Sequence, residues 1–519
     1  MSSSLPDSII VRHEPGRAVT PLHLLVLLSL SLGVIIWGVT SMSGSEGLQF
    51  QSYLGLLAFY GAASAAFVLS RIRRGKLQLF EIPVFITAMS FLQFGLAPLR
   101  NFIDPTQLGR HLSANGEELV QALSYCILGM MAFWAGCQVA RRKQSGQMSS
   151  GPSKEDTVPA SRQVGIMLST IALYAVSFGV KFYLMRSHLY SYTASMEKYY
   201  DNLASMQVLN AISQIGTFAL VVVSIERYRN RSDPVWKVLF WVIFFCEVFW
   251  GLIAGTKTEV FLNLLVVALV SSLIQRRLNL RWLILPAVGF VLFYPVSDAY
   301  RGLVRGRGGE VTSFGGAGRA GHMALQNATQ EGANAGGLWS RGQTRTVQRF
   351  DLLTSVASVL TLGPRASFVR GDAHWWMLPI YPFVPRFLWP SKPILQEAGR
   401  FTVALRGGFG EAGSATAVTY PGDLYLQFGL LGIPVGMFLL GVVAQLFTNR
   451  LSGAIDRQYL FIYACVFLFG FPMEADVFSV WASLIKLLVI LYVVSWVIYG
   501  PRSRRRGLLP SARVPARQP

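Results

Sequence analysis

The sequence predicts an all-α, polytopic integral membrane protein with about twelve transmembrane helices and one large loop between the ninth and the tenth. The 519 residues are 52% hydrophobic and 14% charged, with a mean hydropathy of +0.44. A soluble domain carries about 25% charged residues. Apolar stretches recur along most of the chain, and the basic residues fall in short clusters between them. These observations together indicate a chain that crosses a bilayer many times.

Each predicted span is an apolar stretch close to the roughly 20 residues that cross a bilayer as a helix. A polar amino-terminal tail, residues 1–20, precedes the first stretch, which lacks a small-residue cleavage site and therefore reads as a retained signal anchor. The predicted spans are residues 21–40, 50–70, 80–99, 119–140, 164–185, 208–225, 236–254, 258–275, 280–297, 421–447, 458–474 and 478–499.

The distribution of basic residues predicts the orientation of these spans. Cytoplasmic loops are enriched in Lys and Arg, and here the even-numbered loops carry them whereas the short loop 41–49 has none. Both termini are therefore expected in the cytoplasm, with residues 500–519 as a basic tail. The basic loop residues are Arg71, Arg73, Arg74, Lys76, Arg141, Arg142, Lys143, Arg227, Arg229, Arg231, Arg276, Arg277, Arg281, Arg450 and Arg457.

Charge and cysteine content exclude several classes of function. The net charge of +20 is spread over clusters beside apolar stretches, which favours membrane topology and anionic lipid headgroups over nucleic acid. No base-reading motif accompanies the charge. The four cysteines lie inside predicted spans with no metal-ligand spacing, so neither a structural disulfide nor a zinc site is expected.

The segment 298–420 is predicted to be a large loop on the non-cytoplasmic side. It contains twelve arginines and several tryptophans, and a long loop crosses the membrane regardless of its charge. Its first part, Gly302–Gly342, is Gly-rich and reads as a mobile flap. From Arg345, apolar residues at helical spacing predict an amphipathic helix lying on the bundle or the membrane surface. Such a loop suits an anionic, lipid-linked substrate.

Two local features of the sequence allow both a structural and a functional interpretation. Lys257 and Glu259, after Gly255, form either an interfacial pair or a cation facing a phosphate. His374 beside Trp375 and Trp376 is either part of an aromatic belt or a proton acceptor near a sugar-stacking platform. A phosphate-binding Gly-rich loop, a DxD pair and an HExxH motif are absent from the sequence.

The most specific string is PRFLWPSKP, residues 385–393. Its three prolines predict a rigid, non-helical hook that carries Arg386 and Lys392. The hook is either a structural elbow or a cationic site for an anion. Arg400 and Arg406 follow it, and the next span opens with GDLYLQFGLLG at residues 422–432.

These strings resemble a family. PRFLWPSKP, preceded by LPIYPFV and followed by GDLYLQFGLLG, looks like the pattern of O-antigen and oligosaccharide repeat-unit polymerases of the Wzy type, and GTKTEVFLNLL is similar to the opening of a mid-chain helix in them. The layout also resembles the related O-antigen ligases. Asp423 stands where Glu is expected, and Lys257 where Arg is commoner. The resemblance implies a GT-C-like membrane glycosyltransferase of the bacterial inner membrane.

The implied reaction transfers a glycan from undecaprenyl diphosphate to a second lipid-linked repeat unit at the periplasmic face. It needs cations for the departing diphosphate and one carboxylate or histidine for the attacking hydroxyl. No metal or other cofactor is expected. The candidate base is one of Asp298, His374, Glu411 and Asp423. The candidate diphosphate ligands are Arg386, Lys392, Arg301, Arg305, Arg400 and Lys257, and the candidate sugar-stacking or interface residues are Trp375, Trp376 and Trp389.

Three alternatives are also consistent with the sequence. A ligase that moves the glycan to another acceptor would use nearly the same residues. A flippase or other transporter would place charged residues inside the spans, and here Glu247 and Lys486 are the main examples. A scaffold protein would have no need for so many non-cytoplasmic arginines. For the polymerase, expected partners are the lipid-linked oligosaccharides, the membrane, a chain-length regulator and a flippase.

Overall fold

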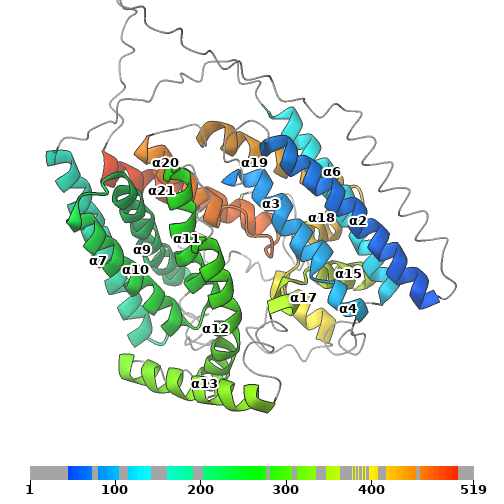
Figure 1. The fold of residues 1–519 in the computed structure, drawn as a ribbon, viewed down its shortest axis with the longest axis horizontal. Coiled ribbons are helices and arrows are strands. Elements are labelled where there is room, and N and C mark those ends of the chain that lie inside the picture. The colour runs from blue at the N-terminus through cyan, green and yellow to red at the C-terminus, as the bar shows by residue number, and fades with distance from the viewer. Residues whose placement is uncertain are drawn as a thin grey trace, which may run out of the picture.

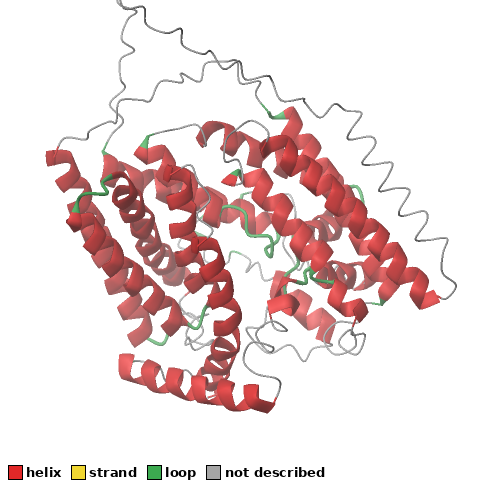
Figure 2. Cartoon of the chain, in the orientation of Figure 1, coloured by secondary structure: helices red, strands yellow, loops and turns green. Residues whose placement is uncertain are grey.

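The computed structural model describes residues 45–72, 80–103, 115–141, 160–190, 203–275, 281–306, 313–334, 346–362, 397–406, 416–451 and 456–500, together with isolated positions between 377 and 392. Every regular element in these ranges is a helix (Figure 2). Most helices run side by side as a bundle, and α13 (Phe314–Asn334) lies across one end of it (Figure 1). The predicted all-α class is confirmed for this part of the chain.

Eight helical segments in the described ranges are long and apolar enough to cross a membrane, so the chain is a multi-pass membrane protein by its helix lengths and composition. Seven of them coincide with predicted spans, and the eighth, Gly432–Arg450, overlaps only the second part of the predicted span 421–447. The predicted first span, 21–40, lies outside the described residues. The eight segments run over α2 (Ser45–Ile72), α3 with η2 and α4 (Ile82–Ser90, Phe91–Leu96, Leu99–Ile103), α6 (Gly116–Val139), α7 (Ala160–Arg186), α9 (Leu203–Arg229), α10 (Pro234–Ala254), α19 (Gly432–Leu451) and α21 (Val477–Tyr499).

Capping residues in the sequence explain where several of these helices begin and end. α6 opens with a capping box in which the side chain of Asn115 accepts from the N–H of Glu118 and the side chain of Glu118 accepts from the N–H of Asn115. Asp233 caps α10 ahead of Pro234, and Asp476 caps α21. α10 ends at Gly255, whose φ of 66° is left-handed and suits glycine.

Helix ends from the basic loops contact one another at one end of the bundle, here named the basic end. Asn449 at the end of α19 donates to the carbonyl of Ala140 after α6, at 2.8 Å. Arg162 of α7 donates to the carbonyl of Tyr499 at 3.0 Å. Arg457, which opens α20 (Arg457–Phe469), pairs with Glu226 of α9 at 3.4 Å. These contacts place the ends of α6, α9, α19 and α21 and the beginnings of α7 and α20 at one end of the bundle, and the side of the membrane on which this end lies stays a prediction.

The opposite end, here named the cap end, carries the helices encoded between α12 (Arg281–Gly306) and α19. These are α13, α15 (Leu353–Leu362), α17 (Glu397–Arg406) and α18 (Tyr420–Phe428) (Figure 1). The turn from α10 into α11 (Lys257–Gln275) also lies at this end. The long segment between the predicted ninth and tenth spans thus covers one end of the bundle.

The third span contains a π-helical turn that helps to build the cap end. Ala97 donates its N–H to Leu92 five residues back, and Pro98 has no N–H to offer Gln93. The carbonyl of Gln93 instead accepts from the N–H of Leu352, at 3.3 Å, just before α15. The carbonyl of the neighbouring Gly95 accepts from the hydroxyl of Tyr53 at 2.7 Å. The π turn therefore supplies a backbone anchor for the start of α15.

The predicted span 421–447 is wrong as a single helix. It consists of α18 and α19, with a break over Gly429–Leu431. Gly429 has a φ of 68°, and Pro434 cannot donate to the preceding turn. A Cβ on Gly432 would meet the carbonyl oxygen of Leu424 at 2.4 Å, so glycine allows the two helices to fold closely together.

The predicted flap Gly302–Gly342 is wrong for most of its length. Residues up to Gly306 continue α12, and residues 314–334 form α13. The buried residues of α13 recur at helical spacing and are small, which lets the helix pack closely on the bundle. Phe314 anchors its first turn against Trp250, with ring centroids 5.8 Å apart. The buried alanines are Ala317, Ala320, Ala324 and Ala328.

The helix predicted after Arg345 exists but is not on a surface. Residues 346–350 are helical, the chain breaks at Asp351–Leu352, and α15 follows. Both the apolar and the hydroxyl-bearing residues over Leu353–Val359 are buried, because α15 packs among α6, α18 and η2. The element with one buried and one exposed face is α13, where Arg319 and His322 are exposed.

Candidate functional site

The cap end holds most of the candidate site residues that fall in the described part of the chain. His374, Trp375, Trp376, Arg386 and Glu411 lie outside the described residues. Arg305 and Lys257 lie in α12 and α11, but their side chains are outside the description. Asp298, Arg301, Lys392, Trp389, Arg400 and Asp423 have a described environment.

The turn between α10 and α11 is held by three side chains of α12. The carbonyl of Gly255 accepts from Nε of Arg301 at 2.7 Å and from the hydroxyl of Ser297 at 3.2 Å. The hydroxyl of Tyr300 donates to the carbonyl of Ile253 at 3.0 Å. A Cβ on Gly255 would meet the Tyr300 ring at 3.1 Å, so a glycine fits this contact as well as its left-handed φ.

This contact brings together two stretches that the sequence singled out separately. Lys257 lies two residues after Gly255, and Arg305 lies one turn beyond Arg301 on α12. Asp298 is on the same helix, one turn before Arg301, and is half-buried. Three predicted diphosphate ligands and one predicted base therefore belong to a single corner of the cap end.

The hook around Arg386 folds back on itself through Lys392. The ammonium of Lys392 donates to the carbonyl of Tyr381 at 2.5 Å and to that of Val384 at 2.9 Å. The rings of Tyr381 and Trp389 lie 5.5 Å apart. These contacts give Lys392 and Trp389 a structural role. In the sequence, Arg386 lies between Val384 and Trp389.

Asp423 is fully buried and ties α18 to α21. Its Oδ2 accepts from the N–H of Val477 at 2.8 Å, which satisfies a backbone donor at the start of α21. Its Oδ1 accepts from the amide of Gln427 at 3.4 Å. α18 itself begins after Thr419, a β-branched residue with a φ of 68°, a strained conformation that is often found at functional sites. The environment of Asp423 fits a structural carboxylate better than a general base.

Arg400 lies on α17, close to the core of the cap end. The next residue, Phe401, is fully buried with Val359, Val418 and Leu426. The hydroxyl of Thr402 accepts from the N–H of Thr416 at 2.8 Å, which joins α17 to the non-helical segment before α18. Arg400, itself half-buried, is thus carried on a helix that is fixed to α15 and α18.

Asp351 is a cap-end carboxylate that the sequence interpretation did not select. It accepts from the amide of Asn101 at 2.6 Å and from the hydroxyl and the N–H of Thr354 at 2.5 and 3.1 Å. Burial raises the pKa of this carboxyl, and the hydrogen bonds from Thr354 and Asn101 oppose the shift. An Asp just before an apolar run was the available signal, since Asp is a preferred residue at the start of a helix.

Lys181 and Glu247 form a buried ion pair inside the spans of α7 and α10. The ammonium of Lys181 reaches both carboxylate oxygens of Glu247, at 2.6 and 2.8 Å, and Thr217 donates to the same carboxylate at 3.2 Å. Gly216 leaves room for it, because a Cβ there would lie 2.6 Å from Glu247. The sequence interpretation noted Glu247 but not Lys181.

The chemistry available at the corner formed by Gly255 and α12 is the binding of an anion by a cationic side chain. Among the described residues, no group of three or more His, Cys, Asp or Glu is arranged to hold a metal ion. Arg301 is positioned by a backbone carbonyl, and a guanidinium can bind a phosphate through two nitrogens at once.

The chain belongs to the family described as domain of unknown function DUF8712, whose model matches residues 119–498. The matched region extends from α6 to α21 and includes α13, α15, α17 and α18 of the cap end. No solved structure matches the chain.

Proposed function

We propose that the protein is a membrane glycosyltransferase that polymerises oligosaccharide repeat units carried on undecaprenyl diphosphate. It acts at the periplasmic face of a bacterial inner membrane, has both termini in the cytoplasm, and builds O-antigen, capsular polysaccharide or exopolysaccharide. We expect four further spans, the predicted stretch 21–40 and the helices α11, α12 and α20, which would give the twelve spans of a GT-C-like protein. A flippase supplies the repeat units, and a chain-length regulator acts with the polymerase.

The observation that carries the proposal is the contact between Arg301 and Gly255. It joins the GTKT turn, with Lys257, to the arginine-bearing end of α12, with Arg305. The two stretches lie far apart in the sequence, and both carry cations suited to binding a diphosphate. Their meeting at the cap end supports a shared anion site for the diphosphate of the donor.

The reaction needs little more than positioning and charge stabilisation. The acceptor hydroxyl attacks the anomeric carbon of the donor sugar, the bond to the diphosphate oxygen breaks, and the hydroxyl proton passes to a carboxylate or histidine. Arg301, Arg305, Lys257 and the cation of the hook, Arg386, offset the charge that develops on the leaving diphosphate. The mechanism requires no metal.

The test compares two α12 variants that lose a contact to the same carbonyl. Arg301→Gln removes the charge, whereas Ser297→Ala removes an uncharged hydrogen bond at 3.2 Å. A null strain of the host is complemented with each variant and its glycan ladder is compared at equal membrane abundance. We expect Arg301→Gln to abolish long chains and Ser297→Ala to leave most of them. A normal ladder from Arg301→Gln would contradict the proposal.

A ligase acting on the same donor is distinguished by its acceptor. Loss of a polymerase leaves single repeat units attached to the final acceptor, whereas loss of a ligase leaves long glycans on the lipid carrier. Analysis of lipid-linked and acceptor-linked glycans in the null strain separates the two.

One observation favours a transporter as the second candidate. The Lys181–Glu247 pair lies inside two spans, and intramembrane ion pairs mark transport pathways in many membrane proteins. In that case loss of the protein would leave lipid-linked repeat units on the cytoplasmic face. Labelling of intact spheroplasts with an impermeant sugar-oxidising reagent distinguishes a transporter from a polymerase. Loss of a polymerase leaves the repeat units on the outer face, where the reagent labels them, and loss of a transporter does not.

A further inference from the structure

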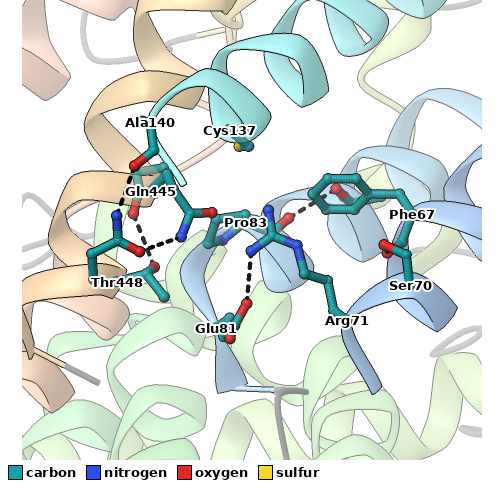
Figure 3. A network of polar contacts seen from close by, with 12 residues as sticks. Phe67, Ser70, Arg71, Glu81, Pro83, Cys137, Ala140, Gln445 and Thr448 are labelled. Carbon is teal, nitrogen blue, oxygen red and sulfur yellow. Dashed lines mark hydrogen bonds and ion pairs between the residues drawn. The ribbon is translucent and has the colours of Figure 1, made fainter. Parts of the chain in front are cut away.

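At the basic end, the guanidinium of Arg71 is held rigidly in the interior. The residue lies in the last turn of α2 and is 1% exposed. Its Nη1 donates to Oε2 of Glu81 at 3.0 Å, and its Cζ lies 4.9 Å from the centre of the Phe67 ring (Figure 3). That ring stacks on Trp134 of α6, with centroids 5.6 Å apart and planes at 21°. The ion pair and the ring together fix the plane of the guanidinium.

The other edge of this guanidinium carries unsatisfied donors. Within the described structure, Nε and Nη2 of Arg71 are buried and have no hydrogen-bond partner. These two nitrogens form the edge that binds two oxygens of one carboxylate or phosphate side by side. Buried donors of a charged group that are left without a partner are unfavourable, because they have lost water and gained nothing in its place. The arrangement therefore calls for a two-oxygen anion.

The neighbouring helices α6 and α19 supply a thiol and a buried hydrogen-bond acceptor without a partner. The thiol of Cys137 on α6 is within electrostatic range of both Arg71 and Glu81, and it donates to the carbonyl of Gly441 on α19 at 3.3 Å. One turn further along α19, Oε1 of Gln445 is buried without a partner, while its amide nitrogen donates to Asn449 (Figure 3). A ligand that carries a hydroxyl or ammonium group beside its anion would satisfy Gln445 as well.

The charges at this end of the fold favour an anion. Glu81 balances Arg71, and Arg141 and Arg450 follow directly at the ends of α6 and α19. Asn449 joins these two ends through the carbonyl of Ala140.

We propose that Arg71 and Gln445 form a phosphate-binding site at the basic end, for the phosphodiester of a phospholipid headgroup. Free phosphate is the other source of the same chemistry. This site is independent of the reaction proposed at the cap end.

The experiment uses the full-length protein, purified in detergent and stripped of lipid. Short-chain phosphatidylglycerol, inorganic phosphate and diacylglycerol are titrated separately, and the melting temperature and the bound lipid by native mass spectrometry are measured. Phosphatidylglycerol is expected to raise the melting temperature, and diacylglycerol is not. Arg71→Lys keeps the charge but loses the two-nitrogen edge, and should weaken phosphatidylglycerol binding about tenfold. Arg319→Ala, which removes an exposed cation of α13 at the cap end, is the control and should bind as the wild type does.

If Arg71→Lys fails to fold, Gln445→Leu tests the site instead, because it keeps Arg71 and removes the acceptor. Weaker phosphatidylglycerol binding by this variant supports the site. Equal binding of inorganic phosphate and phosphatidylglycerol supports the site with free phosphate as its ligand. Phosphatidylglycerol binding no tighter than that of diacylglycerol, or unchanged in both variants, overturns the proposal.

Discussion

The two ends of the bundle use their basic residues differently. At the basic end, buried cations pair with carboxylates, as Arg71 does with Glu81 and Arg457 with Glu226. At the cap end, Arg301 and Lys392 donate to backbone carbonyls, and the exposed Arg349 pairs with Glu474. Membrane orientation explains basic residues at one end only. The cations of the cap end therefore need another explanation, and anion binding is the one we propose.

The largest expected difference between the ends concerns Arg386. Arg386→Ala should abolish long-chain product at normal membrane abundance, because a contact made mainly in the transition state contributes about 3–4 kcal/mol, or a hundred- to a thousandfold in rate. Arg386→Lys should restore only a minor part, since it lacks two-nitrogen geometry. The matched change at the basic end, Arg450→Ala, should leave the glycan ladder intact. A normal ladder from Arg386→Ala would make the hook a structural elbow.

The Lys181–Glu247 ion pair, which lies between the two ends, is either structural or part of a transport pathway. Lys181→Met leaves Glu247 buried without its cation and should lower the free energy of unfolding by about 3–5 kcal/mol. The double variant Lys181→Met with Glu247→Leu should recover most of this loss. Thermal unfolding in detergent measures both. A stable double variant that also polymerises normally would remove the transporter alternative, whereas one that folds but accumulates cytoplasmic-face intermediates would favour it.

The contact between α6 and α19 links the cap end to the basic end through close backbone packing. A Cβ on Gly136 would lie 2.1 Å from the carbonyl oxygen of Phe438, whereas one on Gly165 of α7 would meet nothing within 4 Å. Gly136→Ala should therefore destabilise the protein by about 1–3 kcal/mol. Gly165→Ala, the control, should be neutral or slightly stabilising. Equal melting temperatures for the two variants would show that the helices are not so closely packed.

The smallest effect concerns the pH dependence of stability at the cap end. The pKa of Asp351 is raised above the ordinary value of 3.8 by burial. Its contribution to stability is fully present below that ordinary value and is lost as the pH rises through the raised, folded-state pKa. Asp351→Asn should therefore show a smaller fall in melting temperature than the wild type as the pH rises from about 4 towards neutrality. Parallel profiles would mean that the carboxyl titrates normally.

Sequence patterns predicted the spans because long apolar helices are specified locally. They failed where small residues replace apolar ones. The alanines at 317, 320, 324 and 328 recur at helical spacing, but the intervening glycines made the segment read as irregular. They also misplaced α15, since burial on all sides depends on neighbours from distant parts of the chain. The Arg301–Gly255 contact spans 46 residues and could not be derived from local spacing.

The central claim is that the cap end transfers glycans between lipid carriers, and reconstitution tests it most directly. The purified protein is placed in liposomes with undecaprenyl-diphosphate repeat units isolated from its own host, and products are separated by size. The account predicts a ladder of lipid-linked glycans that forms without added divalent ions, persists with a chelator, and is missing with Arg301→Gln. If the wild type leaves the repeat units at their original length while moving them across the bilayer, the claim is contradicted.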